Sequence, residues 1–110
     1  MAALTLAVNA YAATLPPEDY TRFLIAKYGQ DLATSTHEII VEVIRCESNF
    51  NFDAIGQDGE LGLAQIFLKY HPSITPANAL DPDFSTKFIV DKFRQGEEEL
   101  WTCYDIVTKI

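Results

Sequence analysis

Hydrophobic residues recur at helical spacing along most of this chain, and short turn sequences separate the segments. Apolar positions three and four residues apart form one face of an amphipathic helix. Proline and acidic residues favour the first turn of a helix, and glycine favours its end. On these criteria we predict helices over residues 16–28, 38–48, 63–70, 82–95 and 97–109. The second helix is predicted to start at a capping box, Ser35-Thr36-His37-Glu38.

Two stretches between these segments lack the helical pattern. Residues 49–62 are polar and contain Gly56, Gly59 and Gly62, which predicts a loop or a small irregular hairpin. Residues 71–81 contain prolines and are predicted to form a long ordered connection. The whole pattern predicts a mainly α protein.

The length and charge of the chain limit the classes of function. At 110 residues, the chain has the size of one domain. It carries 8 basic and 16 acidic residues, a net charge of −8. The basic residues are scattered, which argues against a nucleic-acid partner, because phosphate backbones need clustered Lys and Arg. No apolar run approaches the ~20 residues that cross a bilayer, so membrane insertion is not expected.

The first 14 residues differ from the remainder in being apolar and rich in alanine. Residues 1–8 are apolar, and Ala10-Tyr11-Ala12 has the small-x-small form of a signal cleavage site. No Lys or Arg precedes the apolar stretch, so a disordered tail is the alternative interpretation. We expect residues 1–14 to be the remnant of an export signal and residues 15–110 to form the domain. The protein is then expected in the periplasm, at the cell wall or outside the cell.

The two cysteines, Cys46 and Cys103, lie on predicted apolar helix faces. They are either free buried thiols or the two halves of one disulfide in an exported protein. Because the amino terminus favours export, we predict the disulfide, which would tie the helix of Cys46 to the last helix. On the chain-entropy model, such a bond contributes roughly 4 kcal/mol of stability.

Glu47 departs from the expected pattern of its helix. It follows Ile44, Val43 and Ile40 by three, four and seven residues, so it extends the apolar stripe instead of the exposed face. Burial disfavours a charged carboxylate and raises its pKa. A raised pKa suits a general acid that works near neutral pH. The alternative is that the helix frays before Glu47, which would leave an ordinary exposed carboxylate.

Two neighbouring stretches resemble the sequence motif of the lysozyme-like superfamily, and of soluble lytic transglycosylase domains in particular. Glu-Ser-Asn-Phe-Asn at 47–51 is similar to the Glu-Ser-x-Phe-Asn that ends the catalytic helix there, and to the acid-bearing segment of animal-type lysozymes. Gly-Leu-Ala-Gln-Ile at 62–66 is similar to the Gly-Leu-(Met/Ala)-Gln-(Ile/Leu) that follows a glycine-containing loop. The resemblance spans residues 36–104. It implies a lysozyme-like single domain with a small irregular or β-like loop after the catalytic helix.

The resemblance assigns roles to four residues. It implies that Glu47 is the catalytic acid, that Ser48 positions the glycan or holds the glutamate, and that Gln65 lines the sugar cleft. Tyr104 would stand in for the tyrosine that reaches the glutamate in that family, or else be a core aromatic residue. Two family features are missing from this chain: Phe52 stands where proline is usual, and the Ala-Tyr-Asn-Ala-Gly segment is absent.

The resemblance implies an enzyme that cleaves peptidoglycan between N-acetylmuramic acid and N-acetylglucosamine. In a lytic transglycosylase one glutamate is acid and then base, and the sugar's own 6-hydroxyl closes an anhydro ring. A lysozyme-type hydrolase uses a second carboxylate and water. Glu60 lies two residues before Gly62, where animal-type lysozymes carry that second acid, and Asp58 is a weaker candidate. The alternative for Glu60 is a solvated loop residue, and we expect it not to be essential.

Other kinds of function have less support. His37 and His71 lie far apart without metal-ligand spacing around them, so no metal or other cofactor is expected. Cys46 has no nearby histidine to activate it as a nucleophile. A catalytically poor glycan-binding module is an alternative, because a protein of charge −8 is not attracted to an anionic wall. A helical adaptor would leave both motifs unexplained. We expect a monomer whose partner is the peptidoglycan strand.

Overall fold

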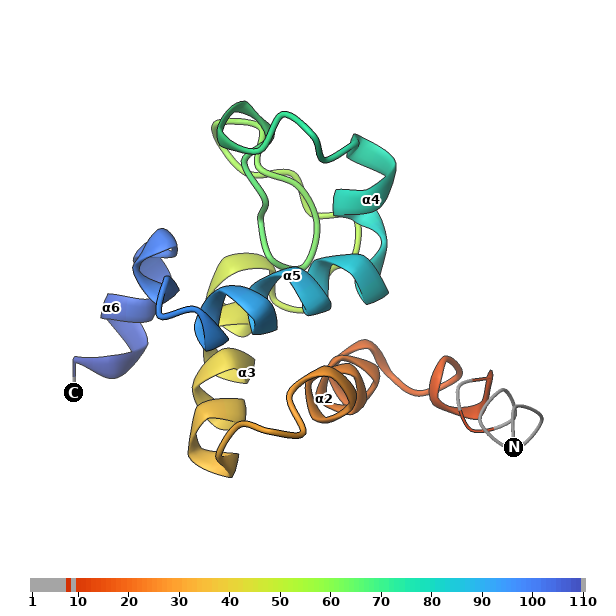
Figure 1. Ribbon diagram of the computed structural model, residues 1–110. Coiled ribbons are helices and arrows are strands. Elements are labelled where there is room, and N and C mark those ends of the chain that lie inside the picture. The colour runs from red at the N-terminus through yellow and green to blue at the C-terminus, as the bar shows by residue number, and fades with distance from the viewer. Residues whose placement is uncertain (1–7, 9, 110) are drawn as a thin grey trace.

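Helices make up most of the chain, with one long non-helical segment at residues 49–67 (Figure 1). The computed structural model describes residue 8 and residues 10–109. Its labelled α-helices are α2 (Pro17–Tyr28), α3 (Thr34–Ser48), α4 (Pro76–Leu80), α5 (Pro82–Arg94) and α6 (Thr102–Thr108). Two 3-10 helices are η1 (Leu68–Tyr70) and η2 (Glu98–Leu100). The prediction of a mainly helical, single-domain protein is confirmed.

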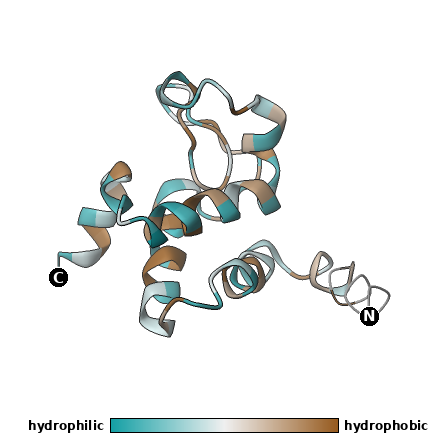
Figure 2. Ribbon diagram, viewed as in Figure 1, coloured by the Kyte–Doolittle hydropathy of each residue, from teal (hydrophilic) through white to brown (hydrophobic). Residues whose placement is uncertain are grey.

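Helix α3 supplies the centre of the hydrophobic core. Ile40, Val43 and Ile44 are each 0% exposed, and Figure 2 shows the middle of α3 coloured as hydrophobic. Helix α2 packs against α3 and α5, and α6 packs against α3. The stripe that the sequence predicts to be buried is buried, and Glu47 continues it at the end of the helix.

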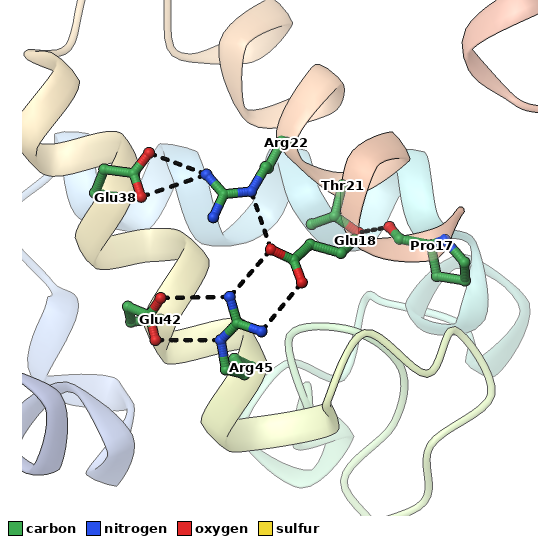
Figure 3. Close-up of polar contacts among 7 residues, drawn as sticks. All are labelled: Pro17, Glu18, Thr21, Arg22, Glu38, Glu42 and Arg45. Carbon is green, nitrogen blue, oxygen red and sulfur yellow. Dashed lines mark hydrogen bonds and ion pairs between the residues drawn. The ribbon is translucent and has the colours of Figure 1, made fainter. Parts of the chain in front are cut away.

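Ion pairs join α2 to the outer face of α3 (Figure 3). Glu18 accepts hydrogen bonds from Arg22 at 3.1 Å and from Arg45 at 3.0 Å. Arg22 also pairs with Glu38, and Arg45 with Glu42. All these side chains are a third or more exposed, so solvent screens each pair and its contribution to stability is small. Arg45 faces α2 through these pairs. Because two positions along a helix correspond to about half a turn, Glu47 points to the opposite side of α3.

The chain turns sharply at the end of α3. Asn49 and Phe50 have left-handed backbone conformations, with φ of 50° and 62°. Asparagine tolerates this conformation, whereas phenylalanine adopts it at an energetic cost. Phe50 is 5% exposed, so core packing holds it there. Asn51 Oδ1 then accepts a hydrogen bond from the amide of Asp53 at 3.0 Å, which is the loop-organising role expected for it.

The glycine-containing loop that follows is an irregular hairpin. Leu61 forms isolated antiparallel bridges with both Ile55 and Ile66. The amide of Gly62 donates to the carbonyl of Ala54 at 2.8 Å. These bonds confirm the predicted loop or small irregular hairpin and bring residues 54 and 62 side by side.

The ends of two helices differ from the prediction. Helix α3 begins at Thr34, with Ala33 in the N-cap position and no side-chain cap. The predicted capping box at residues 35–38 is therefore wrong, because these residues already lie inside the helix. The predicted helix at 97–109 is divided at Trp101, whose backbone is extended (φ −105°, ψ 120°). Its indole N–H donates to a buried backbone carbonyl, and this anchor accounts for the break.

Two other predicted segments also differ. Residues 63–65 form a turn instead of a helix, Ile66 forms an isolated bridge, and only Leu68–Tyr70 are helical, as the 3-10 helix η1. The cause is Gln65, whose φ of 51° is incompatible with a right-handed helix. The predicted connection at 71–81 contains helix α4, which Thr75 caps by accepting a hydrogen bond from the Asn78 amide.

The amino-terminal prediction lies largely outside the described residues. Within the predicted export segment 1–14, residues 1–7 and 9 are among those outside the description. Residues 10–12 are helical, and Ala12 is 2% exposed. In the described part of the chain, no helix has the length and apolar character that a bilayer crossing requires.

Gly62 has no room for a side chain. Its φ is +79°, and a Cβ on it would lie 2.0 Å from the carbonyl oxygen of Ala79. Gly59 is a matched control, because its φ is +89° but a Cβ there would meet nothing within 4 Å. We expect Gly62→Ala to lower the free energy of unfolding by about 3 kcal/mol, from backbone strain plus a clash. Gly59→Ala should cost about 1 kcal/mol, from strain alone.

Urea denaturation of the two variants measures this difference. A larger loss for Gly62→Ala would show that the loop is packed tightly against α4 at the Ala79 carbonyl. Equal losses would contradict the prediction, because they would mean that the carbonyl moves aside without cost.

Candidate active site

A cleft of about 380 Å³ opens beside the end of α3, between the glycine-containing loop and α6. Its volume lies within the range of small-molecule sites. The cleft brings together three residues singled out from the sequence, Glu47, Glu60 and Gln65. The other residues that line it are Phe67, Tyr70, Leu100, Trp101, Thr102, Cys103 and Ile106.

Glu47 lies in the last turn of α3 and is half-buried in the cleft wall. Burial raises the pKa of its carboxyl above the ordinary value. A hydrogen bond from the backbone of Cys103 acts in the opposite direction, and the negative charge of Glu60 raises the pKa of Glu47 further. The direction of the shift agrees with the prediction from the helix pattern. At a given pH, the protonated fraction of Glu47 is therefore larger than that of an exposed glutamate.

The predicted disulfide between Cys46 and Cys103 is present, with an S–S distance of 2.06 Å and a Cα–Cα distance of 6.0 Å. It joins the last turn of α3 to the first turn of α6, directly beside Glu47. The bond therefore holds the α6 wall of the cleft against the helix that carries the acid.

The loop wall of the cleft is built over Gly56. A Cβ at this position would lie 2.4 Å from Gln65 Oε1 and 2.9 Å from Glu60 Oε1, so both side chains occupy space that only glycine leaves free. Glu60 Oε1 also accepts a hydrogen bond from the backbone amide of Asp58 at 2.8 Å. Glu60 is therefore held by its own loop and is among the residues that line the cleft, whereas the side chain of Asp58 is exposed outside the cleft lining.

The side chain of Gln65 is held in place by hydrogen bonds that its amide group donates. Its Nε2 donates to the carbonyls of Ala54 and Gly62 at 3.2 and 3.0 Å. The left-handed backbone of Gln65 turns the side chain back over the hairpin. Such a conformation is costly for a residue other than glycine, and it persists where the surroundings hold it, often at functional sites. Its Oε1 is left as an acceptor.

Aromatic side chains line the part of the cleft next to η1. The rings of Phe67 and Tyr70 pack edge to face with centroids 4.9 Å apart, and Tyr70 is 70% exposed. Trp101 is buried, and its indole N–H donates to the carbonyl of Ala64 at 2.6 Å. Exposed aromatic rings offer an apolar face to a ring-shaped ligand, with a polar edge.

Two residues with predicted roles lie elsewhere. Ser48 Oγ donates to the carbonyl of Ile44 in its own helix, at 3.2 Å. The ring of Tyr104 packs edge-on against Phe93, with centroids 5.8 Å apart. Neither is among the described residues that line the cleft, so their predicted contact with substrate is not supported. The tyrosine of the cleft is Tyr70.

Sequence reasoning missed most of the apolar rim. Tyr70, Leu100 and Ile106 are more than half exposed and line the cleft. In the sequence they continue the same apolar spacing as neighbouring core residues. No signal in the pattern separates a rim position from a core position, because both repeat with the helix period.

The histidines have local roles. The ring of His37 bonds the carbonyl of Gly29 at 2.6 Å through Nε2, and His71 packs edge-on against Phe88 with centroids 5.0 Å apart. In the residues that the structure describes, no group of three or more His, Cys, Asp or Glu is placed to hold a metal ion.

The cleft therefore combines a half-buried carboxylic acid, a second carboxylate and a fixed amide oxygen. Such a set can donate a proton to a leaving oxygen and stabilise developing positive charge. Comparisons of the chain with protein-family models, with curated proteins and with solved structures found no match.

Proposed function

We propose that this protein cleaves peptidoglycan strands between N-acetylmuramic acid and N-acetylglucosamine, as a lytic transglycosylase. The observation that carries the proposal is Glu47, a half-buried carboxylic acid with a raised pKa that lines a cleft of about 380 Å³. The resemblance of residues 47–51 and 62–66 to the transglycosylase motif points to the same residue. The disulfide supports export, because such bonds persist in oxidising compartments.

In this mechanism Glu47 acts first as an acid. Its protonated carboxyl gives a proton to the glycosidic oxygen, the bond from C1 to that oxygen breaks, and the leaving sugar departs as an alcohol. The ionised Glu47 then removes the proton from the 6-hydroxyl of the remaining sugar. The freed oxygen bonds to C1 and closes the anhydro ring, and Glu47 ends protonated for the next turnover.

A lysozyme-type hydrolase is the second candidate, because Glu60 lines the same cleft and its charge acts on Glu47. There, the second carboxylate attacks or stabilises the cationic sugar, and water completes the reaction. One oxygen of Glu60 is already committed to the amide of Asp58. We favour the transglycosylase, which needs no second carboxylate.

Mass spectrometry of the fragments released from purified peptidoglycan tests the proposal. Anhydro-muramic ends are expected. Reducing ends would contradict the transglycosylase proposal and indicate a hydrolase. If no fragment is released, the protein is not a glycan-cleaving enzyme. A binding measurement with the same strands would then test whether it is a glycan-binding module.

Glu60→Gln is expected to retain most of the cleavage and to change its pH dependence. The charge of Glu60 raises the pKa of Glu47, so removing it lowers that pKa. Cleavage needs protonated Glu47, so the fall in rate at high pH should begin at a lower pH in the variant. A pH–rate profile measures the shift.

Asp58→Asn is the matched control for this variant. It removes the same charge from the same loop, but Asp58 is exposed outside the cleft lining, so the profile should stay in place. If Glu60→Gln loses as much activity as removal of Glu47, the mechanism uses both carboxylates and the hydrolase is correct.

A further inference from the structure

The backbone of Ala64 is held on both sides by side chains from other segments. Its N–H donates a hydrogen bond to Ser85 Oγ at 2.9 Å, and its carbonyl accepts one from the indole N–H of Trp101 at 2.6 Å. Ala64 and Ser85 are each 0% exposed, and Trp101 is 5% exposed. A buried backbone group that loses its partner gains no bond to water in exchange, so both bonds are costly to break. We call these two bonds the Ala64 clamp.

The clamp directly precedes the left-handed residue of the loop wall, Gln65, whose φ is 51°. The peptide group that joins Ala64 to Gln65 is bonded at both ends. Its carbonyl accepts from Trp101, and its N–H donates to the carbonyl of Gly62 at 3.0 Å. A costly backbone conformation persists where the surroundings determine it. The direction of the Gln65 side chain therefore depends on this peptide group.

The clamp connects the loop wall to other parts of the fold. The side-chain and backbone amides of Gln65 donate to Ala54 and Gly62, which belong to the same glycine-containing loop. Ser85, by contrast, belongs to α5, and Trp101 lies between η2 and α6. The clamp therefore sets the position of Gln65 relative to the helices that surround the cleft.

Ser85 lies outside the cleft that it supports. It is fully buried and is not among the described residues that line the cleft, so a bound strand does not touch it. Its neighbour on α5, Thr86, is equally buried, and within the described structure its hydroxyl has no hydrogen-bond partner. Of two adjacent buried hydroxyls, only the one at Ser85 bonds the loop wall.

We propose that Ser85 is a positioning residue of the cleft: through the Ala64 amide it fixes the backbone of Gln65 and so places the Gln65 side chain against the bound glycan strand. This inference rests on the proposed function, in which Gln65 lines the sugar cleft. It assigns Ser85 to strand binding and not to proton transfer, because the acid, Glu47, lies on α3 and outside the clamp.

Ser85→Ala removes the acceptor of the Ala64 amide. We expect the KM for soluble peptidoglycan strands to rise about tenfold, the equivalent of one lost hydrogen bond, while kcat and the pH–rate profile stay unchanged. Thr86→Val is the matched control. It removes a hydroxyl from the next position of α5, at the same burial and with nearly the same shape, so its KM should equal that of the wild type.

Ser85→Thr separates positioning from a general loss of stability. It keeps a hydroxyl acceptor on the same Cβ but adds a methyl group to a fully buried site, which should lower the midpoint of urea unfolding. We expect this variant to be less stable than the wild type and yet to keep the wild-type KM. A residue that acts through stability alone would give a KM that rises with every loss of stability.

Hydrogen exchange of the Gln65 backbone amide, followed by NMR, needs no substrate. This amide should exchange faster in Ser85→Ala and at the wild-type rate in Thr86→Val, because only the first variant loosens the segment that carries it. Trp101→Phe breaks the other bond of the clamp and keeps an aromatic ring. It should also speed the exchange, which tests the inference if Ser85→Ala does not fold.

Three results would overturn the inference: an unchanged KM in Ser85→Ala, an equal rise of KM in Thr86→Val, and a KM that follows stability in Ser85→Thr. Failure of the proposed function gives a different result, because no variant then cleaves the strands while the Gln65 amide still exchanges faster without the clamp. Cleavage by the wild type, together with an unchanged KM and unchanged exchange in Ser85→Ala, overturns the inference and leaves the proposed function standing.

Discussion

Glu47→Gln should lower the rate of glycan cleavage by about 10²–10⁴-fold while the fold stays intact. The amide keeps the shape of the carboxyl group but cannot donate the proton that the leaving oxygen needs. Glu47 is half-buried in the cleft wall, and the other carboxylate of the cleft, Glu60, is held on its own loop by the amide of Asp58. The rate of fragment release from purified peptidoglycan measures the effect, and cleavage at the wild-type rate would rule out Glu47 as the acid.

Glu42→Gln is the control on the same helix. Glu42 lies on the face of α3 that pairs with Arg45 and is 46% exposed, outside the described cleft lining. Removing its charge should leave the cleavage rate unchanged. A comparable loss of cleavage rate in both variants would mean that activity depends on the overall charge of α3 and not on a proton donated by Glu47 in the cleft.

The melting temperature of Glu47→Gln shows whether the variant has lost catalysis alone or has also lost its fold. The folded state raises the pKa of Glu47 above 4.5, so folded protein holds the proton more tightly than unfolded protein. Stability then falls as pH rises from 4.5 through the folded-state pKa. Glutamine has no charge to bury, so the variant should melt above the wild type at neutral pH, and this difference should vanish in acid. An inactive variant that melts below the wild type at pH 7 would contradict this explanation.

The side chains that the sequence places correctly are those that a single helix controls. Glu47 follows the buried residues Ile40, Val43 and Ile44 at fixed helical intervals, so its direction depends on local geometry alone. The same rule brings Cys46, one residue earlier, to the side where α6 packs.

The side chains that the sequence misplaces depend on contacts between distant segments. Residues 63–70 have the apolar composition of a helix, but Ile66 pairs with Leu61 and Gln65 takes a left-handed conformation. The last predicted helix is divided because Trp101 reaches the carbonyl of Ala64. Tertiary contacts here override local propensity.

The tyrosine of the cleft shows the same limit. Tyr70 lies four residues after Ile66 and Tyr104 four residues after Leu100, so both have an apolar residue at helical spacing in the sequence. Which one reaches the cleft depends on the turn at η1 and on the break before α6. Neither feature follows from the helical period, so Tyr70 could not be chosen over Tyr104 in advance.

Removal of the Cys46–Cys103 disulfide should lower the free energy of unfolding by about 4 kcal/mol. The bond joins residues 57 positions apart, so reducing it frees a long segment of the unfolded chain. Small domains commonly have only about 5–15 kcal/mol of stability. The double variant Cys46→Ser with Cys103→Ser should therefore unfold at a much lower urea concentration than the wild type.

Reduction of the wild-type protein provides the control for this experiment. Reductant should bring its unfolding midpoint down to that of the double variant and leave the double variant unchanged. Titration of unreduced, denatured wild-type protein should find no reactive thiol. Cleavage should also fall under conditions where the double variant is still folded, because the α6 wall of the cleft is no longer tied to α3. Two reactive thiols, or equal urea midpoints, would show that no disulfide stabilises the protein in solution.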